Sequence, residues 1–246
     1  MSLRRHNVDH VSPSSLNLWL SNPHQWCRRY LLKEPSDSGP AMWRGTAVEN
    51  GLVHWLRVED WDHALYAAYT TFDQNAQGEL SDEITAERAL IEPMLRQLMK
   101  LSWLTPLWAT QIKVTHWFHG CDVPCIGYVD LALDGKDTDL KTTKACPSAP
   151  RPAHVRQVAL YRAARNKPGT VLYVTKAKTA EYDVTDAMRD EAMRDLEHAA
   201  QSLSRFLNKM DTPDEALACL PRNPDDFRTS APSLRGTASG FEAMGA

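Results

Sequence analysis

The stretch GYVDLALDGKDTDLKTTK, residues 127–144, places two aspartates and a lysine on what its pattern predicts to be one β-hairpin. Apolar and polar residues alternate on both sides of a glycine, as in strands with one buried face. We place a two-residue turn at Gly135 and Lys136, with glycine first as a type II′ turn prefers. The resulting cross-strand pairs are Leu133 with Thr138, Ala132 with Asp139, and Asp130 with Lys141.

This register gives the hairpin one charged and one apolar face. The charged face holds Asp130, Ala132, Asp139 and Lys141, and the apolar face holds Val129, Leu131, Leu133, Thr138 and Leu140. One interpretation is a cross-strand ion pair on a solvated face, which contributes at most about 1 kcal/mol. The other is a metal site, because Mg²⁺ or Mn²⁺ relieves the repulsion between close carboxylates. The lysine could then stabilise charge on a phosphate or orient a water.

Neighbouring segments favour the metal site. Gln157 and Tyr161 are spaced i, i+4 on one predicted helix face, with His154 one turn earlier. Such a polar pair is unexpected on a helix that packs against a sheet. Upstream, Glu49 lies in RGTAVENG, where Gly45 permits close backbone approach, and could add a third carboxylate.

The motifs, in chain order, resemble those of the PD-(D/E)XK nucleases, in the branch containing RecB-type and phage λ-type exonucleases. The core of the resemblance is GYVD (127–130), DLK (139–141) and QVALY (157–161). RGTAVENG (44–51) is similar to the family's glycine-led helix motif. SPSSLNLWLSNPHQWCRRYLL (12–32) is similar to the opening of RecB-type domains, and LPRNPDDF (220–227) to a stretch near their C-terminus. Each motif is short, but the ordered set covers nearly the whole chain.

The resemblance implies an α/β fold with a restriction-endonuclease-like core, in which helices flank a small mixed β-sheet after a helical N-terminal part. It implies Mg²⁺ or Mn²⁺ as cofactor. The catalytic residues implied are Asp130, Asp139, Lys141, Gln157 and Tyr161, and the metal ligands are Asp130, Asp139, Leu140 and Glu49. The DNA contacts implied are Trp43, Arg44, Thr142, His154 and Arg156, with Trp43 considered for base stacking.

Two positions depart from the family pattern. Many RecB-type members have histidine where this chain has Glu49, and Asp139 replaces the commoner glutamate. Some relatives hold an iron–sulfur cluster, but here Cys27 fits the first ligand position and only Cys219 lies near the others. Four thiolates cannot be assembled that way, so we expect no cluster.

The function that follows is metal-dependent DNA exonuclease activity, in phage-type recombination, repair or genome processing. The alternatives are a structure-specific endonuclease, an RNA-acting nuclease, and, from another class, a catalytically silent DNA-binding subunit. The intact set Asp130, Asp139 and Lys141 argues against the silent subunit. The partners expected are DNA with a free end and, by analogy, a single-strand-annealing or recombination protein.

Two other residue sets could in principle bind a zinc ion or phosphate groups. His116, His119, Cys121 and Cys125 match no standard zinc spacing, and the two histidines would point to opposite faces of a strand, so we expect no zinc. Four arginines allow two interpretations, a track of phosphate contacts or an ordinary solvated helix. They are Arg151, Arg156, Arg162 and Arg165.

The chain of 246 residues is expected to be a single nuclease domain, with a helical part (1–105), a catalytic core (106–210) and a mostly irregular tail (211–246). Helices are predicted within 12–32 as a pair, and over 41–59, 61–77, 81–101, 154–166 and 185–210. Strands are predicted over 111–120, 124–135, 136–143, 170–176 and 180–184. No long apolar run or secretory leader is evident, and five cysteines fit reduced thiols. We therefore expect no membrane contact and a cytoplasmic location, in the host if phage-encoded.

Overall fold

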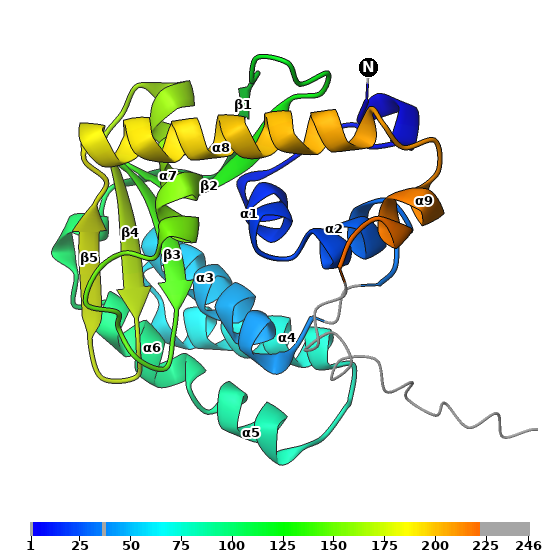
Figure 1. Ribbon diagram of the computed structural model, residues 1–246. Helices are drawn as coiled ribbons and strands as arrows, with labels where there is room; N and C mark the ends of the chain where they lie inside the picture. The colour runs from blue at the N-terminus through cyan, green and yellow to red at the C-terminus, as the bar shows by residue number, and fades with distance from the viewer. Residues whose placement is uncertain (1, 36–37, 222–246) are drawn as a thin grey trace, which may run out of the picture.

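The computed structural model describes residues 2–35 and 38–221 and shows a mixed five-stranded sheet with helices on both faces (Figure 1). The strands are β1 (Leu107–His116), β2 (Cys125–Leu133), β3 (Asp137–Thr142), β4 (Gly169–Val174) and β5 (Thr179–Asp183), in that spatial order. Neighbours are antiparallel except β3 and β4, which are parallel. A parallel pair needs a crossover, which α7 (Pro152–Arg165) supplies. The predicted α/β architecture is confirmed.

The helical N-terminal part is also confirmed. It contains α1 (Pro13–Ser21), α2 (Pro23–Tyr30), α3 (Pro40–Val58), α4 (Trp61–Ala76), α5 (Asp82–Arg88) and α6 (Ile91–Leu98), with 3₁₀ turns at Arg4–His6 and Ser102–Leu104. Ser12 caps α1 as predicted, since its Oγ accepts the Ser15 N–H at 3.1 Å and Pro13 takes the first helical position.

Two helix predictions need correction. The single helix expected over 81–101 is two helices, because Pro93 has no N–H to donate to the carbonyl of Ala89, four residues back. After α8 (Asp186–Leu207), a short α9 (Pro213–Ala218), capped by Thr212, lies in the tail expected to be mostly irregular. Most of the motif at 220–227 lies outside the described residues.

The register of the β2–β3 hairpin also differs from the prediction. Leu131 pairs with Thr138, and Ala132 with Asp137, so Asp130 does not face Lys141. The turn is Asp134–Gly135, one residue earlier than expected, because glycine takes the second turn position with a φ of +79°. The pairing slips by two residues, an even number, so Asp130 on β2 still lies on the same face as Asp139 and Lys141 on β3.

Two apolar layers hold helices against the sheet. Helices α7 and α8 cover one face, and α3, α4 and α6 cover the other (Figure 1). Gly127 on β2 lets α7 approach closely, since a Cβ there would lie 3.0 Å from Leu160 and 3.1 Å from Tyr161. A Cβ at Gly45 would meet Thr142 Oγ1 only at an ordinary 3.4 Å, so the close approach expected there is absent.

Candidate active site

The site forms where β2 and β3 separate. Within the described residues, β2 and β3 form antiparallel pairs only at Leu131–Thr138 and Ala132–Asp137. Next along β2, Asp130 Oδ2 accepts the backbone N–H of Leu140 at 3.0 Å, so a side chain bridges the strands in place of backbone pairing. This fork, formed by Asp130 on β2 and residues 139–141 on β3, brings together the two predicted aspartates.

Asp139 is completely buried and only half satisfied. Its Oδ1 accepts from Lys141 Nζ at 2.8 Å, whereas its Oδ2 has no hydrogen-bond partner among the described residues. An unsatisfied buried carboxylate oxygen is costly, and one within a group of acids points to a cation. The fork therefore offers an open acceptor beside a fixed ammonium.

Glu49 joins the two aspartates through a residue that the sequence did not reveal. Gln111 on β1 donates from Nε2 to Glu49 Oε1 at 2.5 Å, and the same nitrogen lies 3.5 Å from Asp130 Oδ1. Gln111 has a φ of +52°, an uncommon conformation for a non-glycine residue. A polar residue on an edge strand gives no sequence signal of such a role.

Burial and mutual repulsion make the acids hard to ionise. Burial, and secondarily the charge of Asp130, raises the pKa of Glu49 to about 7. Burial raises the pKa of Asp139 to about 7 although Lys141 opposes the shift, and burial also raises the pKa of Asp130. Burial disfavours the Lys141 ammonium, but Asp139 and Asp130 more than compensate and raise its pKa. Three acids thus face one ammonium, an arrangement that favours uptake of protons or of another cation.

The donor set fits a hard divalent ion that retains water. No three His, Cys, Asp or Glu side chains converge as a ready-made metal cage within the described part of the chain. Mg²⁺ commonly binds through one or two carboxylates together with waters and substrate phosphate, rather than in an all-protein cage. Asp130 and Asp139, with the open Oδ2, match that requirement. Leu140 contributes its N–H to Asp130, and its place as a ligand stays a prediction.

Helix α7 presents the expected polar pair to the site. Gln157 Nε2 donates to the Tyr161 hydroxyl at 2.6 Å, and Tyr161 is fully buried. Burial, with the charges of Asp139 and Asp130, raises the pKa of Tyr161 well above its usual range, so its hydroxyl stays neutral. Gln157 also lines a pocket of about 370 Å³ that borders Asp130.

Two of the predicted DNA contacts are core residues instead. The Trp43 ring is buried edge-on against Phe72, and its Nε1 donates to Ser38 Oγ at 3.1 Å. Arg44 is buried and ion-paired with Glu87 of α5. Neither side chain can stack on a base or contact a phosphate from these positions, because the second apolar layer encloses them.

The other three predicted DNA contacts are already engaged within the protein. Thr142 accepts from Arg44 through both its carbonyl and its hydroxyl, at 3.4 and 3.3 Å. His154 Nδ1 lies 2.8 Å from the Tyr173 hydroxyl, and burial lowers the pKa of His154 to about 4, so the ring is neutral. Arg156 pairs with Asp195 at 2.7 Å.

Three of the four arginines considered for a phosphate track, all except Arg151, are ion-paired within the protein. Arg162 pairs with Asp186 and Arg165 with Asp137, each at 2.7 Å. These partners, together with Asp195 beside Arg156, neutralise most of the positive charge of α7. These three side chains are largely buried in ion pairs with α8 and β3, so they form neither a free phosphate track nor a solvated face.

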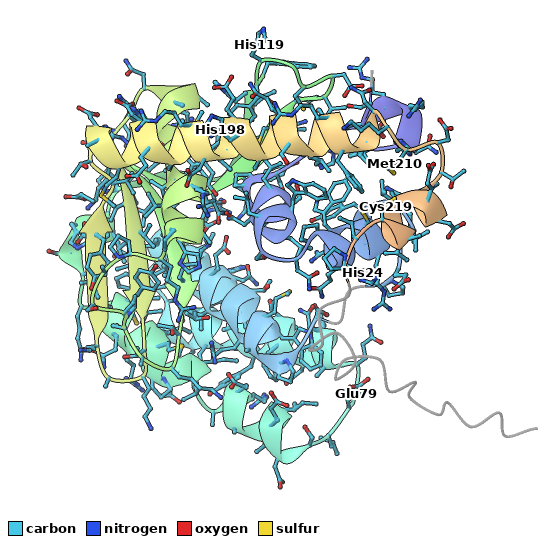
Figure 2. All side chains as sticks on the ribbon, in the orientation of Figure 1. His24, Glu79, His119, His198, Met210 and Cys219 are labelled. Atoms are coloured by element: carbon cyan, nitrogen blue, oxygen red, sulfur yellow. The ribbon has the colours of Figure 1, made fainter. Side chains whose placement is uncertain are left out.

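The cysteine and histidine sets are dispersed. Cys27 is buried in the core of the protein, whereas Cys219 is exposed at the C-terminal end of α9 (Figure 2). His119 points outward from the β1–β2 connection (Figure 2), and His116 packs against Phe118 with ring centroids 4.8 Å apart. Burial raises the pKa of the Cys125 thiol to about 12.

The fork, its lysine and the polar pair on α7 together agree with one family. The family model described as the PD-(D/E)XK nuclease superfamily matches residues 10–223. The chain belongs to this superfamily. It is therefore a nuclease, and the match spans both the helical N-terminal part and the catalytic core.

One solved structure shows the same fold. The crystal structure of a "Putative exonuclease" from Eubacterium rectale has a TM-score of 0.58 at 14% identity, covering 90% of this chain and 94% of its own. That of LHK-Exo in complex with dAMP has a TM-score of 0.35 at 11% identity, covering 68% of this chain and 94% of its own. No curated protein sequence matches significantly. Among the described helices, none is long and apolar enough to cross a membrane.

Proposed function

We propose that this nuclease is a Mg²⁺- or Mn²⁺-dependent exodeoxyribonuclease that acts on DNA ends, with Asp130, Asp139 and Lys141 at its centre. The observation that carries this proposal is the fork. One oxygen of the buried Asp139 carboxylate contacts Lys141, and the other has no hydrogen-bond partner in the part of the chain that the structure describes. The family supplies the reaction class, phosphodiester hydrolysis. The exonuclease assignment rests on resemblance, and a role in phage-type recombination or repair follows by analogy only.

Each residue has a distinct task in this proposal. Asp130 and Asp139 hold the ion, with Glu49 linked to them through Gln111. A bound divalent ion would polarise the scissile phosphate and favour ionisation of an attacking water. Lys141, fixed by Asp139, places its ammonium where negative charge develops on phosphate. Gln157 and Tyr161 stay neutral and orient groups in the pocket beside Asp130.

Release of acid-soluble nucleotides from linear DNA by purified protein tests this proposal. We expect activity that depends on Mg²⁺ or Mn²⁺ and is abolished by EDTA. Asp139→Asn should lose at least about 1,000-fold in rate, as expected when a positioned electrostatic group is removed. Asp134→Asn is the matched control, because it makes the same chemical change at an exposed residue of the same hairpin.

The outcomes separate the alternatives. DNA binding without cleavage in any divalent ion would support the catalytically silent subunit. Preferential cleavage of RNA, or of branched DNA, would support the RNA-acting or structure-specific alternatives. Full activity in Asp139→Asn would reject the site assignment.

A further inference from the structure

The pocket that borders Asp130 contains an aromatic ring with no role in the site so far. Tyr128 lies two residues before Asp130 on β2, so strand alternation places both side chains on one face. Both residues line the pocket of about 370 Å³, together with Gln157 and the start of α1 at Ser12. Tyr128 is 47% exposed, although its strand neighbours Gly127 and Val129 are buried. The ring therefore forms part of the entrance to the acidic site.

A cation lies directly across from this ring. Lys113 on β1 is the register partner of Tyr128, and facing side chains in an antiparallel pair have Cβ atoms about 4.5–5.5 Å apart. Lys113 is exposed and takes part in no ion pair among the described residues. This contrasts with Arg156, Arg162 and Arg165, whose charges are already paired.

Exposure alone would not give Tyr128 a function. Tyr66 on α4 is 70% exposed, yet it lines no pocket near the fork. Tyr128 differs because its ring, an available ammonium and a buried carboxylate group lie together. An aromatic face beside a cation is the combination that a nucleotide requires, with a base for the ring and a phosphate for the ammonium.

We propose that Tyr128 and Lys113 form a nucleotide subsite next to the scissile phosphate, where an unpaired base stacks on Tyr128 and a neighbouring phosphate contacts Lys113. The inference rests on the proposed function and deepens it. A base can stack on a protein ring only after it leaves its own stack, so the ligand class is a single-stranded or frayed terminal nucleotide. The subsite recognises the base by its π face, so it accepts all four bases.

Steady-state cleavage of a linear oligonucleotide in Mg²⁺ tests the subsite. Base stacking on an aromatic side chain predicts that Tyr128→Leu raises KM by about 10-fold with little change in kcat, whereas Tyr128→Phe keeps the ring and stays near wild type. Tyr66→Leu, the same change at an exposed ring away from the pocket, should match wild type. Lys113→Gln should raise KM and reduce the slope of log(kcat/KM) against log salt by about one. Lys209→Gln, the same change at an exposed lysine just after α8, should leave that slope unchanged.

An abasic substrate shows whether the ring acts on a base. Abasic nucleotides at the terminal positions should raise KM for wild type, and Tyr128→Leu should then add no further penalty. The subsite is rejected if Tyr128→Leu stays within twofold of wild type on normal DNA, or if its full penalty persists on abasic DNA. If the wild-type protein cleaves no nucleic acid at all, the proposed function fails and the subsite fails with it.

Discussion

At the scale of single residues, the site depends on a balance between one ammonium and three acids. Lys141 is held by Asp139 at 2.8 Å, and its pKa is raised, so it remains charged over the whole pH range in which nucleases operate. The opposite oxygen of Asp139 has no hydrogen-bond partner within residues 2–35 and 38–221. One side of this carboxylate therefore orients the lysine, and the other is available to an ion. The two functions can be separated by mutation.

Lys141→Ala should lower turnover far more than it weakens metal binding. The ammonium acts on charge that develops at the phosphate, and loss of such a group costs on the order of 100- to 1,000-fold in kcat. Removing a positive charge beside two ligands should, if anything, tighten Mn²⁺ binding. Calorimetric Mn²⁺ titration alongside kcat at saturating Mn²⁺ measures both effects. Lost affinity with unchanged kcat would assign Lys141 to metal binding instead.

The raised carboxylate pKa values predict an unusual pH dependence of stability in the metal-free protein. The folded-state pKa of Asp139 is about 7, above its value of 3.8 in an unfolded chain, so between these values the folded state binds more protons. Stability should therefore fall as pH rises from about 4 to about 7 and then level off. Asp139→Asn should flatten this decline. Added Mn²⁺ should raise the stability of the wild-type protein at pH 7 and above, where Asp139 is ionised.

Melting temperatures in EDTA and in Mn²⁺, measured across this pH window, check that prediction. Asp134→Asn serves as the control, because its exposed carboxylate has no part in the fork. Identical pH profiles for wild type and Asp139→Asn in EDTA would show that burial does not hold the proton on Asp139.

At the scale of elements, a buried ion pair ties the N-terminal helices to the catalytic strand. Arg44 of α3 pairs with Glu87 of α5 and also donates to the carbonyl and hydroxyl of Thr142, one residue after Lys141. Lys144 reaches the same Glu87 at 2.8 Å. The short helix α5 thus fixes the end of β3 through Arg44, although it lies below α3 and α4, outside the sheet (Figure 1).

Glu87→Gln should destabilise the protein strongly. It leaves Arg44 buried without its counter-charge, a change that costs about 4 kcal/mol and corresponds to roughly 10 °C in melting temperature for a chain of this size. Glu92→Gln is the matched control, since its pair with Arg96 is solvent-exposed and contributes at most about 1 kcal/mol. Thermal unfolding of both variants compares the two pairs. Equal, small losses would mean that Arg44 is not held by Glu87.

At the scale of the whole molecule, the protein has little means of gripping a long duplex. Its net charge is -3, and most arginines of α7 are neutralised by acids of α8 and the sheet. Nonspecific affinity for duplex DNA comes from many phosphate contacts, and the three ion-paired arginines of α7 are not available to make them. Selectivity must then come from the entrance to the site, where Gln157, Tyr128 and the start of α1 border Asp130.

The protein should therefore require a DNA end. Side-by-side digestion with Mg²⁺ should degrade linear duplex at least about 100-fold faster than covalently closed circular duplex of the same sequence, a ratio set by the near-absence of nonspecific phosphate contacts. Nicked circles distinguish a requirement for a terminus from one for a single-strand break. Equal rates on linear and closed circular DNA would instead favour the endonuclease alternative.

The family, the mixed sheet and the chain order of the functional segments could all be predicted from the residues alone. Local patterns predict a structure well when they involve residues close in sequence. Examples are the Ser12 cap of α1 and the i, i+4 pair of Gln157 and Tyr161. Those features depend on residues a few positions apart, so they form wherever the segment itself is helical. The break before α6 was not predicted, although Pro93 stands in the first turn of that helix.

Which polar residues reach the site, and which are buried in the core, follows from the packing of segments that are distant in sequence. Trp43 and Arg44 are residue types that often contact nucleic acids, but here they are buried because α3 packs against α4 and α5. No local sequence pattern predicts that packing. Gln111 reaches Glu49 across 62 positions of sequence. The hairpin register likewise follows from the left-handed conformation of Gly135. Burial and long-range contact are properties of the assembled layers, and a local motif cannot encode them.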